Sequence, residues 1–504
     1  MLKCEWTNSK EEINFWQANL DAVKRKVLLE RIFIVKKDEA HRLKNIPQIM
    51  NHEKNKSHYL KPYVVEKEYL SENYPNLLER AGNGFLLIND KINKIALLDN
   101  APDGEMRGTP IFDAKELKDL ESTFDSIKKV AVSLEDYLKT INLSHHKKEM
   151  LSVFVTTECN LNCDYCFTNK HEDGHRNQTV DLEFVKKGID DYFETDYLRH
   201  IRFFGAGEPT VKLDLIKAIH KYAKEKGGDC VTFEIQTNGA FNGSTANWLA
   251  KNIDIIWISC DGTPDMQDLH RKCLDTRKKS SELIERNIRI LRSGNNFVGI
   301  RATITNENVD RQKEMIDYFC QLGIKHIWVD PIFPSVGEDT SNNSFDYMHF
   351  AEQFLEAVNY AEQKDIFYGS IMTCNFSDTV NKHCRACIPV PHLTTDGYVS
   401  ACDMALFGED TNHMSPFIYG KWDPLLKKII YNDEKIRNLQ SRTTENMHHC
   451  DACPSKEHCG GYCLGEVLNE TKDLFGCKKG VCEAIVYLDK KMGESQRKYH
   501  YTHP

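Results

Sequence analysis

The sequence predicts an α/β fold, because short apolar runs alternate with stretches of helical length and periodicity between about residues 149 and 333. The apolar runs are the expected strands and cover residues 151–155, 200–204, 231–236, 255–260, 297–302 and 326–330. The expected helices lie between them, at residues 181–193, 213–226, 244–252, 280–293 and 310–322. Repeated β-α units imply a parallel sheet, either an open doubly wound sheet or a partial barrel.

Composition limits the classes of protein to which the chain can belong. Its 504 residues are 40% hydrophobic, enough for about three domains with ordinary cores. A formal charge of −9 and the lack of a long Lys/Arg tract argue against general nucleic-acid binding. No apolar run approaches the ~20 residues needed to cross a bilayer, and the first residues lack the apolar core of a signal peptide. We therefore expect a cytoplasmic protein with no membrane partner, whose 18 cysteines stay reduced and serve as metal ligands.

The first ~147 residues are expected to form a separate small α+β module, with no cysteine after Cys4. Two apolar runs flank a polar turn within residues 83–100, the pattern of a β-hairpin. Residues 113–138 have helix-like spacing with acidic residues early. This module is either a structural cap on the domain that follows or a part that captures the substrate.

A cysteine array follows the first strand of the α/β region. Cys159, Cys163 and Cys166 have the spacing C-x3-C-x2-C. Thiolates are the soft ligands that iron-sulfur clusters take, and three of them hold three irons of a cubane while the fourth iron stays open for chemistry. Zinc is the alternative metal, since His171 is near enough in the sequence to complete such a site.

Three further loops follow expected strands, where ligands of parallel sheets bind. Gly205-Ala206-Gly207-Glu208-Pro209 combines glycines, which let a backbone approach a ligand, with a proline that begins a helix. Gln236-Thr237-Asn238-Gly239 follows the third strand, and Ser259-Cys260-Asp261-Gly262 follows the fourth, with His270-Arg271 beyond it. Each of these loops alone would be an ordinary turn, and their shared position at strand ends indicates a ligand site.

The C-terminal region is dense in cysteine. Cys384 and Cys387 are followed by Gly397 and Cys402, and the later members are Cys450, Cys453, Cys459, Cys463, Cys477 and Cys482. Eight thiolates are enough for two four-thiolate iron-sulfur clusters. Spacing alone does not separate iron from zinc in such knuckles, and His448, His449 and His458 border the cysteines.

These motifs together resemble a known family. The C-x3-C-x-aromatic-C triad before a partial barrel resembles the radical S-adenosylmethionine (SAM) enzymes. The later cysteines, Cys387-x9-Gly397-x4-Cys402, then Cys450-x2-Cys453-x5-Cys459-x3-Cys463 and Cys482, resemble the SPASM extension found in anaerobic sulfatase maturases and peptide-modifying (RiPP) maturases. The resemblance covers about residues 149–487 and implies a partial (β/α)6 barrel followed by a cysteine-rich domain.

The resemblance implies a role for each matching residue near SAM. Cys159, Cys163 and Cys166 would hold the SAM-binding 4Fe–4S cluster. Gly205, Ala206, Gly207, Glu208 and Pro209 would receive the methionine amino group, with Ala206 in place of the family's usual glycine. The other expected SAM-binding residues are Tyr165 near the adenine, Ser259 at the ribose or carboxylate, Arg271 at the carboxylate, and Thr237 and Asn238 in the pocket.

The resemblance also implies two auxiliary 4Fe–4S clusters. The first would be held by Cys384, Cys387, Cys402 and Cys463, and the second by Cys450, Cys453, Cys459 and Cys482. Cys384 has an alternative, because some relatives carry this ligand further upstream, where this chain has Asn381. In that alternative the first cluster keeps an open iron. Cys477 is an alternative to Cys482. Asp403 matches an aspartate that acts as a base on the substrate in sulfatase maturases, although it is also explained as a turn residue.

The predicted domains follow from these assignments. They are an N-terminal α+β module at 1–147, a radical SAM core at 148–345, a helical bridge at 346–380, a SPASM domain at 381–490 and a polar tail at 491–504. The resemblance implies an enzyme that oxidatively modifies a peptide or protein, with an external electron donor such as flavodoxin or ferredoxin. In many such maturases a module of strands and helices binds the leader of the precursor peptide. The alternatives are an anaerobic sulfatase maturase and a non-catalytic zinc or iron-sulfur protein.

Overall fold

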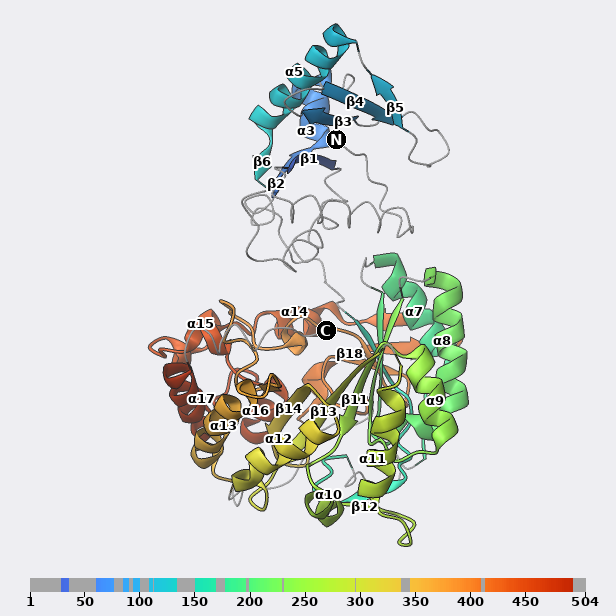
Figure 1. The fold of residues 1–504 in the computed structure, drawn as a ribbon, viewed down its shortest axis with the longest axis vertical. Coiled ribbons are helices and arrows are strands. Elements are labelled where there is room, and N and C mark those ends of the chain that lie inside the picture. The colour runs from blue at the N-terminus through green and yellow to red at the C-terminus, as the bar shows by residue number, and fades with distance from the viewer. Residues whose placement is uncertain are drawn as a thin grey trace. The chain divides into compact units, whose positions relative to one another are not determined.

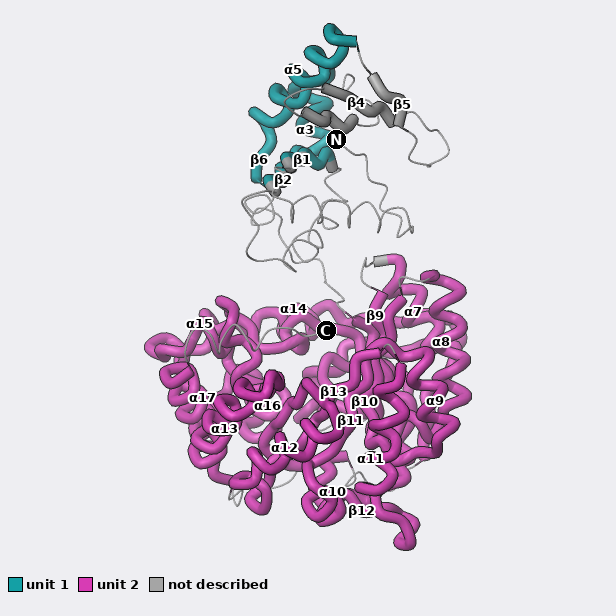
Figure 2. The backbone as a smooth tube through the Cα atoms, in the orientation of Figure 1, with its two compact units in different colours: residues 1–145 teal, residues 146–504 magenta. Residues whose placement is uncertain are grey.

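The structure is a computed structural model of the full 504-residue chain. It describes residues 29–35, 60–76, 85–89, 94–99, 108–111, 113–133, 150–168, 177–195, 199–228, 231–294, 296–336, 345–408 and 413–492. Cys4, His171, the turn at 90–93 and the tail beyond residue 492 lie outside these ranges. The chain forms two compact units, residues 1–145 and 146–504 (Figure 2).

The second unit is built on one sheet that changes character along its width. Its strand order is β15-β14-β13-β11-β10-β9-β7-β16-β17-β18-β19. Neighbouring strands from β15 to β16 pair in parallel, whereas β16 to β19 form an antiparallel extension. The parallel strands are β7 (Leu151–Phe154), β9 (His200–Phe204), β10 (Thr232–Thr237), β11 (Ile255–Ser259), β13 (Phe297–Ile304), β14 (His326–Pro331) and β15 (Phe367–Gly369).

The antiparallel extension comes from the cysteine-rich C-terminal region. Its strands are β16 (His392–Leu393), β17 (Tyr398–Ser400), β18 (Ile418–Asp423) and β19 (Lys428–Tyr431). β16 pairs with β7, the first strand of the parallel part, with His392 opposite Ser152 and Leu393 opposite Val153. The cysteine-rich region therefore continues the main sheet and shares its core.

Helices follow the parallel strands and lie around the outside of the sheet (Figure 1). They are α7 (Leu182–Thr195), α8 (Leu213–Gly227), α9 (Gly243–Asn252), α10 (Pro264–His270), α11 (Ser280–Leu291), α12 (Gln312–Gln321) and α13 (Tyr347–Glu362). The C-terminal helices are α14 (Asp433–Gln440), α15 (Lys456–Cys459), α16 (Leu464–Thr471) and α17 (Lys479–Lys491). Short 3-10 helices lie at Pro209–Lys212, Val309–Arg311, Arg385–Cys387, Ser415–Phe417, Thr444–Asn446 and His448–Cys450. No helix in the described ranges is both long and apolar enough to span a bilayer.

The core of the second unit explains why these segments take these forms. Large apolar side chains from the strands, such as Phe203 and Phe233, are fully buried against helix residues such as Phe184 and Phe319. Alternating strands and helices with one apolar face each can bury that face only by stacking helices on the sheet. The predicted α/β class is confirmed, and the run of parallel strands with helices between them agrees with the predicted partial barrel.

The first unit contains two small sheets. β1 (Leu29–Val35), β2 (Leu60–Glu66) and β6 (Val132–Ser133) form one, with β1 and β2 parallel. The antiparallel strands β3 (Phe85–Asn89), β4 (Lys94–Asp99) and β5 (Gly108–Ile111) form the other. Its helices are α3 (Lys67–Asn73) and α5 (Ala114–Val130). The expected hairpin within residues 83–100 is confirmed by the pairing of β3 and β4, whereas the expected helix at 113–138 ends at Val130 and is followed by β6.

Candidate functional site

The loop that carries the cysteine triad is fixed by a small antiparallel pair of strands. β8 (Leu161–Cys163) lies within the loop and pairs with β12 (Arg271–Cys273), which places Arg271 opposite Cys163. Two more backbone hydrogen bonds extend the pairing, from Asp164 N to His270 O at 3.2 Å and from Leu274 N to Asn160 O at 3.1 Å. The cluster loop, defined here as residues 156–168, is therefore attached to the segment that follows β11 and α10.

The three thiols of the cluster loop lie close enough together to interact electrostatically. Burial raises the pKa of Cys159 to about 11 and that of Cys163 to about 12, and the neighbouring thiols of the triad add to both shifts. Asn238 Nδ2, at the end of β10, lies 3.8 Å from Cys159 Sγ. Metal binding needs thiolates, so thiol protons of the triad would be released when a metal binds.

Glycines allow the loop after β9 to pack directly on the cluster loop. Gly207 N donates to Thr156 O at 2.9 Å, and Glu208 N donates to Glu158 O at 2.8 Å. A Cβ on Gly207 would lie 2.2 Å from the Glu158 carbonyl oxygen, and one on Gly205 would lie 2.9 Å from the Gly207 oxygen. Side chains at these positions cannot be accommodated without moving the backbone of the cluster loop.

The buried carboxylate of Glu208 is held by hydrogen bonds from neighbouring residues. Its side chain is 2% exposed and accepts hydrogen bonds from Thr210 N and Oγ1 at 3.0 and 2.6 Å. It also accepts hydrogen bonds from Thr237 Oγ1 and from Asn238 N, both at 2.7 Å. The carboxylate thus joins the ends of β9 and β10, while Pro209 begins the short helix that follows.

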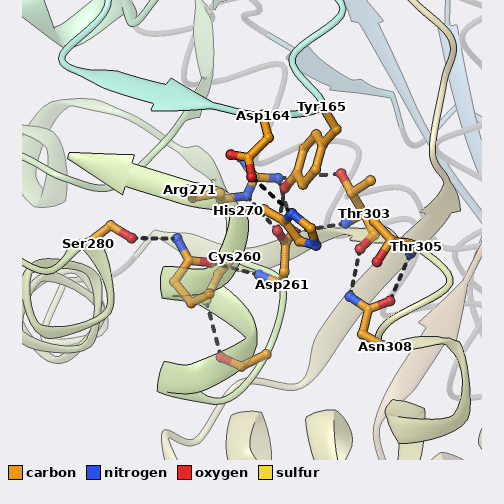
Figure 3. A network of polar contacts seen from close by, with 12 residues as sticks. Asp164, Tyr165, Cys260, Asp261, His270, Arg271, Ser280, Thr303, Thr305 and Asn308 are labelled. Carbon is orange, nitrogen blue, oxygen red and sulfur yellow. Dashed lines mark hydrogen bonds and ion pairs between the residues drawn. The ribbon is translucent and has the colours of Figure 1, made fainter. Parts of the chain in front are cut away.

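Tyr165 and Arg271 meet at a buried carboxylate (Figure 3). Asp261, just after β11, accepts hydrogen bonds from Arg271 Nε at 3.0 Å, from Arg271 Nη2 at 3.1 Å and from the Tyr165 hydroxyl. The Arg271 guanidinium also lies 5.3 Å from the centre of the Tyr165 ring. Asp261 belongs to the loop Ser259-Cys260-Asp261-Gly262 that the sequence indicated, but the sequence predicted no role for it.

A cavity of about 640 Å³ opens between the parallel strands and the cysteine-rich region. It is within the size range of small-molecule sites. Several residues predicted from the sequence line it: Cys163, Tyr165, Cys166, Ser259, Arg271, Cys384, Cys402, Asp403 and Cys463. Thr237 and Asn238 are 2% and 9% exposed and are absent from the lining, as are Gly205 to Pro209.

Asp403 lies at the cavity in contact with a buried arginine. Arg202 on β9 donates from Nη2 to Asp403 Oδ1, and its Nε and Nη2 donate to Ser152 Oγ at 3.2 and 3.1 Å. His392 Nε2 lies 3.7 Å from the same carboxylate oxygen. Burial opposes ionisation of Asp403, but Arg202 and then His392 outweigh it and hold its pKa below the ordinary value.

Nine cysteines of the C-terminal region form two groups. In the first group, Cys384, Cys387, Cys402 and Cys463 interact electrostatically, and the Cys387 thiol lowers the pKa of Cys384 by hydrogen bonding. The second group consists of Cys450, Cys453, Cys459, Cys477 and Cys482. Cys477 Sγ and Cys482 Sγ are 3.5 Å apart, so both alternatives for the last ligand lie at this group. Cys374 lies beside Cys384 and Cys459, whereas Asn381 bonds Glu445.

Comparison with known proteins decides the family. Residues 153–319, which include the triad and the loops after β9, β10 and β11, match the radical SAM superfamily. The chain contains a radical SAM domain. It is therefore an enzyme, because members of this superfamily are enzymes, and the non-catalytic alternative is set aside. A radical SAM domain implies a 4Fe–4S cluster and SAM as cofactors.

Two relatives of this radical SAM enzyme match different lengths of the chain. The uncharacterized protein MJ0907 of Methanocaldococcus jannaschii is 31% identical over 36% of this chain, and the match spans 63% of that relative. The radical SAM cyclopropyl synthase TigE of Paramaledivibacter caminithermalis is 21% identical over 69% of this chain and 74% of its own length.

Two solved structures share the fold. anSMEcpe with bound AdoMet has a TM-score of 0.55 at 16% identity and covers 70% of this chain and 99% of its own. SuiB of Streptococcus suis bound to precursor peptide SuiA has a TM-score of 0.51 at 13% identity and covers 79% of this chain and 98% of its own. At these identities the likeness concerns the fold.

The residues of the triad fit a cluster of the implied kind. Three thiols of the soft type that iron takes lie on one loop, and the glycine backbone after β9 leaves no room for side chains beside that loop. Within the described parts of the chain, no three His, Cys, Asp or Glu side chains gather closely enough to hold a single metal ion. The alternative zinc ligand His171 lies outside those parts.

Sequence reasoning missed three polar residues of the site. Arg202 is a charged residue in the middle of an otherwise apolar strand, a signal that a buried partner exists. His392 had no such local signal, because its partner Asp403 lies on another segment. Asp261 stood in a loop that the sequence had indicated, but its partners Tyr165 and Thr303 lie 96 and 42 positions away.

Proposed function

We propose that the chain is a radical SAM peptide maturase, which oxidatively modifies or crosslinks a residue of a ribosomally made peptide or protein. The observation that carries this proposal is a single cavity lined both by Cys163 and Cys166 of the cluster loop and by Cys384, Cys402 and Cys463 of the C-terminal region. A substrate residue in that cavity lies between the two cysteine regions. The likeness to SuiB, solved with a precursor peptide, supports a peptide as substrate.

The bound cluster and SAM would supply a 5'-deoxyadenosyl radical, which abstracts a hydrogen atom from the substrate. Cys159, Cys163 and Cys166 would hold the cluster. Ser259 and Arg271 line the cavity where they can orient SAM, and Tyr165 packs beside Arg271. The backbone of Gly205 to Pro209 and the buried Thr237 and Asn238 would act by fixing the loops around the cluster.

We assign the two groups of C-terminal cysteines to two auxiliary 4Fe–4S clusters. Cys384, Cys387, Cys402 and Cys463 are four thiols in one group, which supports a first cluster without an open iron. Cys450, Cys453, Cys459 and Cys482 would hold the second cluster, with Cys477 as the alternative to Cys482. An external flavodoxin or ferredoxin would supply electrons in the cytoplasm.

Asp403 would accept the proton that the substrate loses when its radical is oxidised, and the auxiliary cluster proposed at the first group of cysteines would take the electron. Its carboxylate faces the cavity with 34% of the side chain exposed, and the ion pair with Arg202 keeps it charged. A charged, positioned carboxylate can accept a proton directly from a substrate group within hydrogen-bond reach.

The N-terminal unit would bind the leader of the precursor. In its second sheet, ordered β3-β4-β5, strand β3 pairs only with β4 among the described strands, and an extended peptide can add to such an edge. A remote binding module raises the effective concentration of the reacting segment at the cavity.

The proposed domains of the chain remain residues 1–147, 148–345, 346–380, 381–490 and 491–504. Residues 346–380 contain both α13 and the strand β15, which joins the sheet of the core.

The proposal is tested with short peptides encoded beside this chain in its genome. Reconstituted, reduced enzyme should convert one of them to a product of lower mass by about two hydrogens, with 5'-deoxyadenosine formed in step. Sulfatase maturation is the second candidate, favoured by the likeness to anSMEcpe over 99% of that chain. A sulfatase-derived peptide with a cysteine or serine, converted to formylglycine in place of the neighbouring peptides, would select it.

A further inference from the structure

Asp261 is the point at which the polar contacts around the cluster loop converge (Figure 3). Its side chain is fully buried, and it follows β11 at the end of the strand. The carboxylate accepts from the Tyr165 hydroxyl, from Nε and Nη2 of Arg271 at 3.0 and 3.1 Å, and from Thr303 N at 3.0 Å. Its own backbone N–H donates to Gln267 Oε1 at 2.9 Å. Every oxygen of this buried group therefore has a partner.

The partners of the Asp261 carboxylate come from three different places in the fold. Tyr165 belongs to the cluster loop, Arg271 begins β12 and Thr303 lies on β13. Arg271 is also the residue opposite Cys163 in the pairing of β8 and β12. Since paired strands lie about 4.8 Å apart, a shift of Arg271 would be transmitted directly to the backbone of Cys163.

The two side chains that Asp261 holds both line the cavity, whereas Asp261 itself does not. The Arg271 fork is bound in a bidentate manner, which fixes the plane of its guanidinium group. Burial disfavours the charge of Arg271, but the carboxylate of Asp261 outweighs burial and keeps the pKa of Arg271 well above its ordinary value. The guanidinium thus stays charged beside the cavity, and Asp261, which lies outside the cavity lining, sets its orientation.

We propose that Asp261 is a positioning residue for SAM binding, acting through Arg271 and Tyr165 and through the register of the cluster loop. The inference rests on the proposed function in one respect, namely that SAM binds at this end of the cavity. Replacing a residue that hydrogen-bonds a metal ligand typically lowers metal affinity or activity by about 10–100-fold. We expect an effect of the same size on SAM binding when the hydrogen-bond partner of a SAM-contacting residue is replaced. A residue that only stabilised the fold would leave the affinity of the folded protein for SAM unchanged.

Two variants and a matched control separate a positioning role from a structural one. Asp261→Asn keeps the shape and part of the accepting capacity but removes the charge and the bidentate acceptor for Arg271. Asp268→Asn is the matched control, because Asp268 is an acceptor on the neighbouring helix α10, bonded to Ser280 and Ser281 and not to the cluster loop. Arg271→Lys provides a second route, since lysine keeps the charge and cannot form the fork.

The experiment uses the full-length, iron-loaded protein under reducing conditions. The electron paramagnetic resonance signal of the reduced cluster is titrated with SAM, and the iron content and the unfolding midpoint are measured in parallel. We expect the Kd for SAM to rise by about 10–100-fold in Asp261→Asn and to rise in Arg271→Lys, with no change in Asp268→Asn. If Asp261→Asn does not fold, the Kd for SAM is measured in Arg271→Lys and Tyr165→Phe instead, and we expect it to rise in both.

Two outcomes would overturn the inference. One is a wild-type Kd for SAM in folded, iron-loaded Asp261→Asn, and the other is an equal rise in Asp268→Asn, which would indicate general destabilisation. The proposed function fails differently: wild-type protein that forms no 5'-deoxyadenosine contradicts it, whatever the behaviour of the variants.

Discussion

Arg202 and Asp403 form an ion pair between β9 and the residue that follows Cys402, although 201 positions separate them in the sequence. Arg202 is 5% exposed, bonds Ser152 on β7 and lies with its guanidinium 4.8 Å from the centre of the Phe204 ring. The pair therefore connects the parallel strands of the radical SAM domain with the cysteine-rich region. It also gives a carboxylate in the cavity a fixed place and a stable charge.

Replacing Asp403 by asparagine tests its role as a base. We expect product formation from the peptide substrate to fall by about 10²–10⁴-fold, the usual effect of a general base. Formation of 5'-deoxyadenosine without substrate should persist, because Asp403 lies among the C-terminal cysteines and not in the cluster loop. Asp423→Asn, on β18, is the matched control. Full product formation by Asp403→Asn would show that the base is another group.

Replacing Gly207 by alanine tests the packing of the cluster loop. The new Cβ would lie 2.2 Å from the carbonyl oxygen of Glu158, so the loop must move and the triad should lose its cluster. We expect iron content to fall by about four per chain, with SAM cleavage lost. At Gly243, where the nearest atom to a new Cβ is 3.9 Å away, alanine should change neither quantity. Normal iron content in Gly207→Ala would contradict the proposed site.

The two groups of C-terminal cysteines predict separable iron losses. Cys450→Ala with Cys453→Ala should remove about four of about twelve irons, and Cys402→Ala with Cys463→Ala should remove a different four. Each loss should leave the triad's cluster and its response to SAM intact, since the proposed clusters are held by separate groups of cysteines. Bound zinc in place of iron, found by elemental analysis of protein purified without air, would refute the auxiliary clusters.

Within the second group, Cys477 and Cys482 are 3.5 Å apart, and they are the two candidates for one ligand of the proposed second auxiliary cluster. Cys482→Ser should lower the iron content, whereas Cys477→Ser should not, if Cys482 is the ligand. The reverse result would assign Cys477. Mössbauer spectra of the two variants, recorded after the same reconstitution, show how much iron each variant holds in clusters.

Removing residues 1–140 tests the N-terminal unit. We expect the truncated enzyme to bind a full-length precursor more weakly and to cleave SAM in the absence of substrate at nearly the full rate. The second expectation follows because this unit is compact by itself and separate from the unit that holds the triad. Fluorescence anisotropy with a labelled precursor gives the affinities. Equal affinity with and without the unit would make it a structural cap.

Much of the architecture was predictable from the sequence, because strong apolar periodicity controls it. The strand expected at 200–204 is β9 without change, and the helix expected at 213–226 is α8 with one residue added. The strand expected at 297–302 continues to Ile304, since Thr303 and Ile304 pair with Asp330 and Pro331 of β14. That pairing partner is far away in the sequence and leaves no local pattern.

The short strands and the polar contacts of the site were not predictable in the same way. β8 and β12 have three residues each, and only their pairing makes them strands. The hydrogen bonds of Asp261 and the ion pair of Arg202 with Asp403 depend on how distant segments are brought together by the fold. Cysteine spacing, in contrast, predicts three ligands for a cluster without any tertiary contact, because all three candidate thiols lie on one loop.

Formation of 5'-deoxyadenosine tests the central claim most directly. The wild-type chain and a variant with Cys159, Cys163 and Cys166 all replaced by alanine are loaded with iron and sulfide, reduced with dithionite and supplied with SAM. We predict 5'-deoxyadenosine from the wild type and none from the variant, while the variant keeps about eight irons in its C-terminal region. Undiminished 5'-deoxyadenosine formation by the triple variant would contradict the assignment of the triad as the site of SAM cleavage.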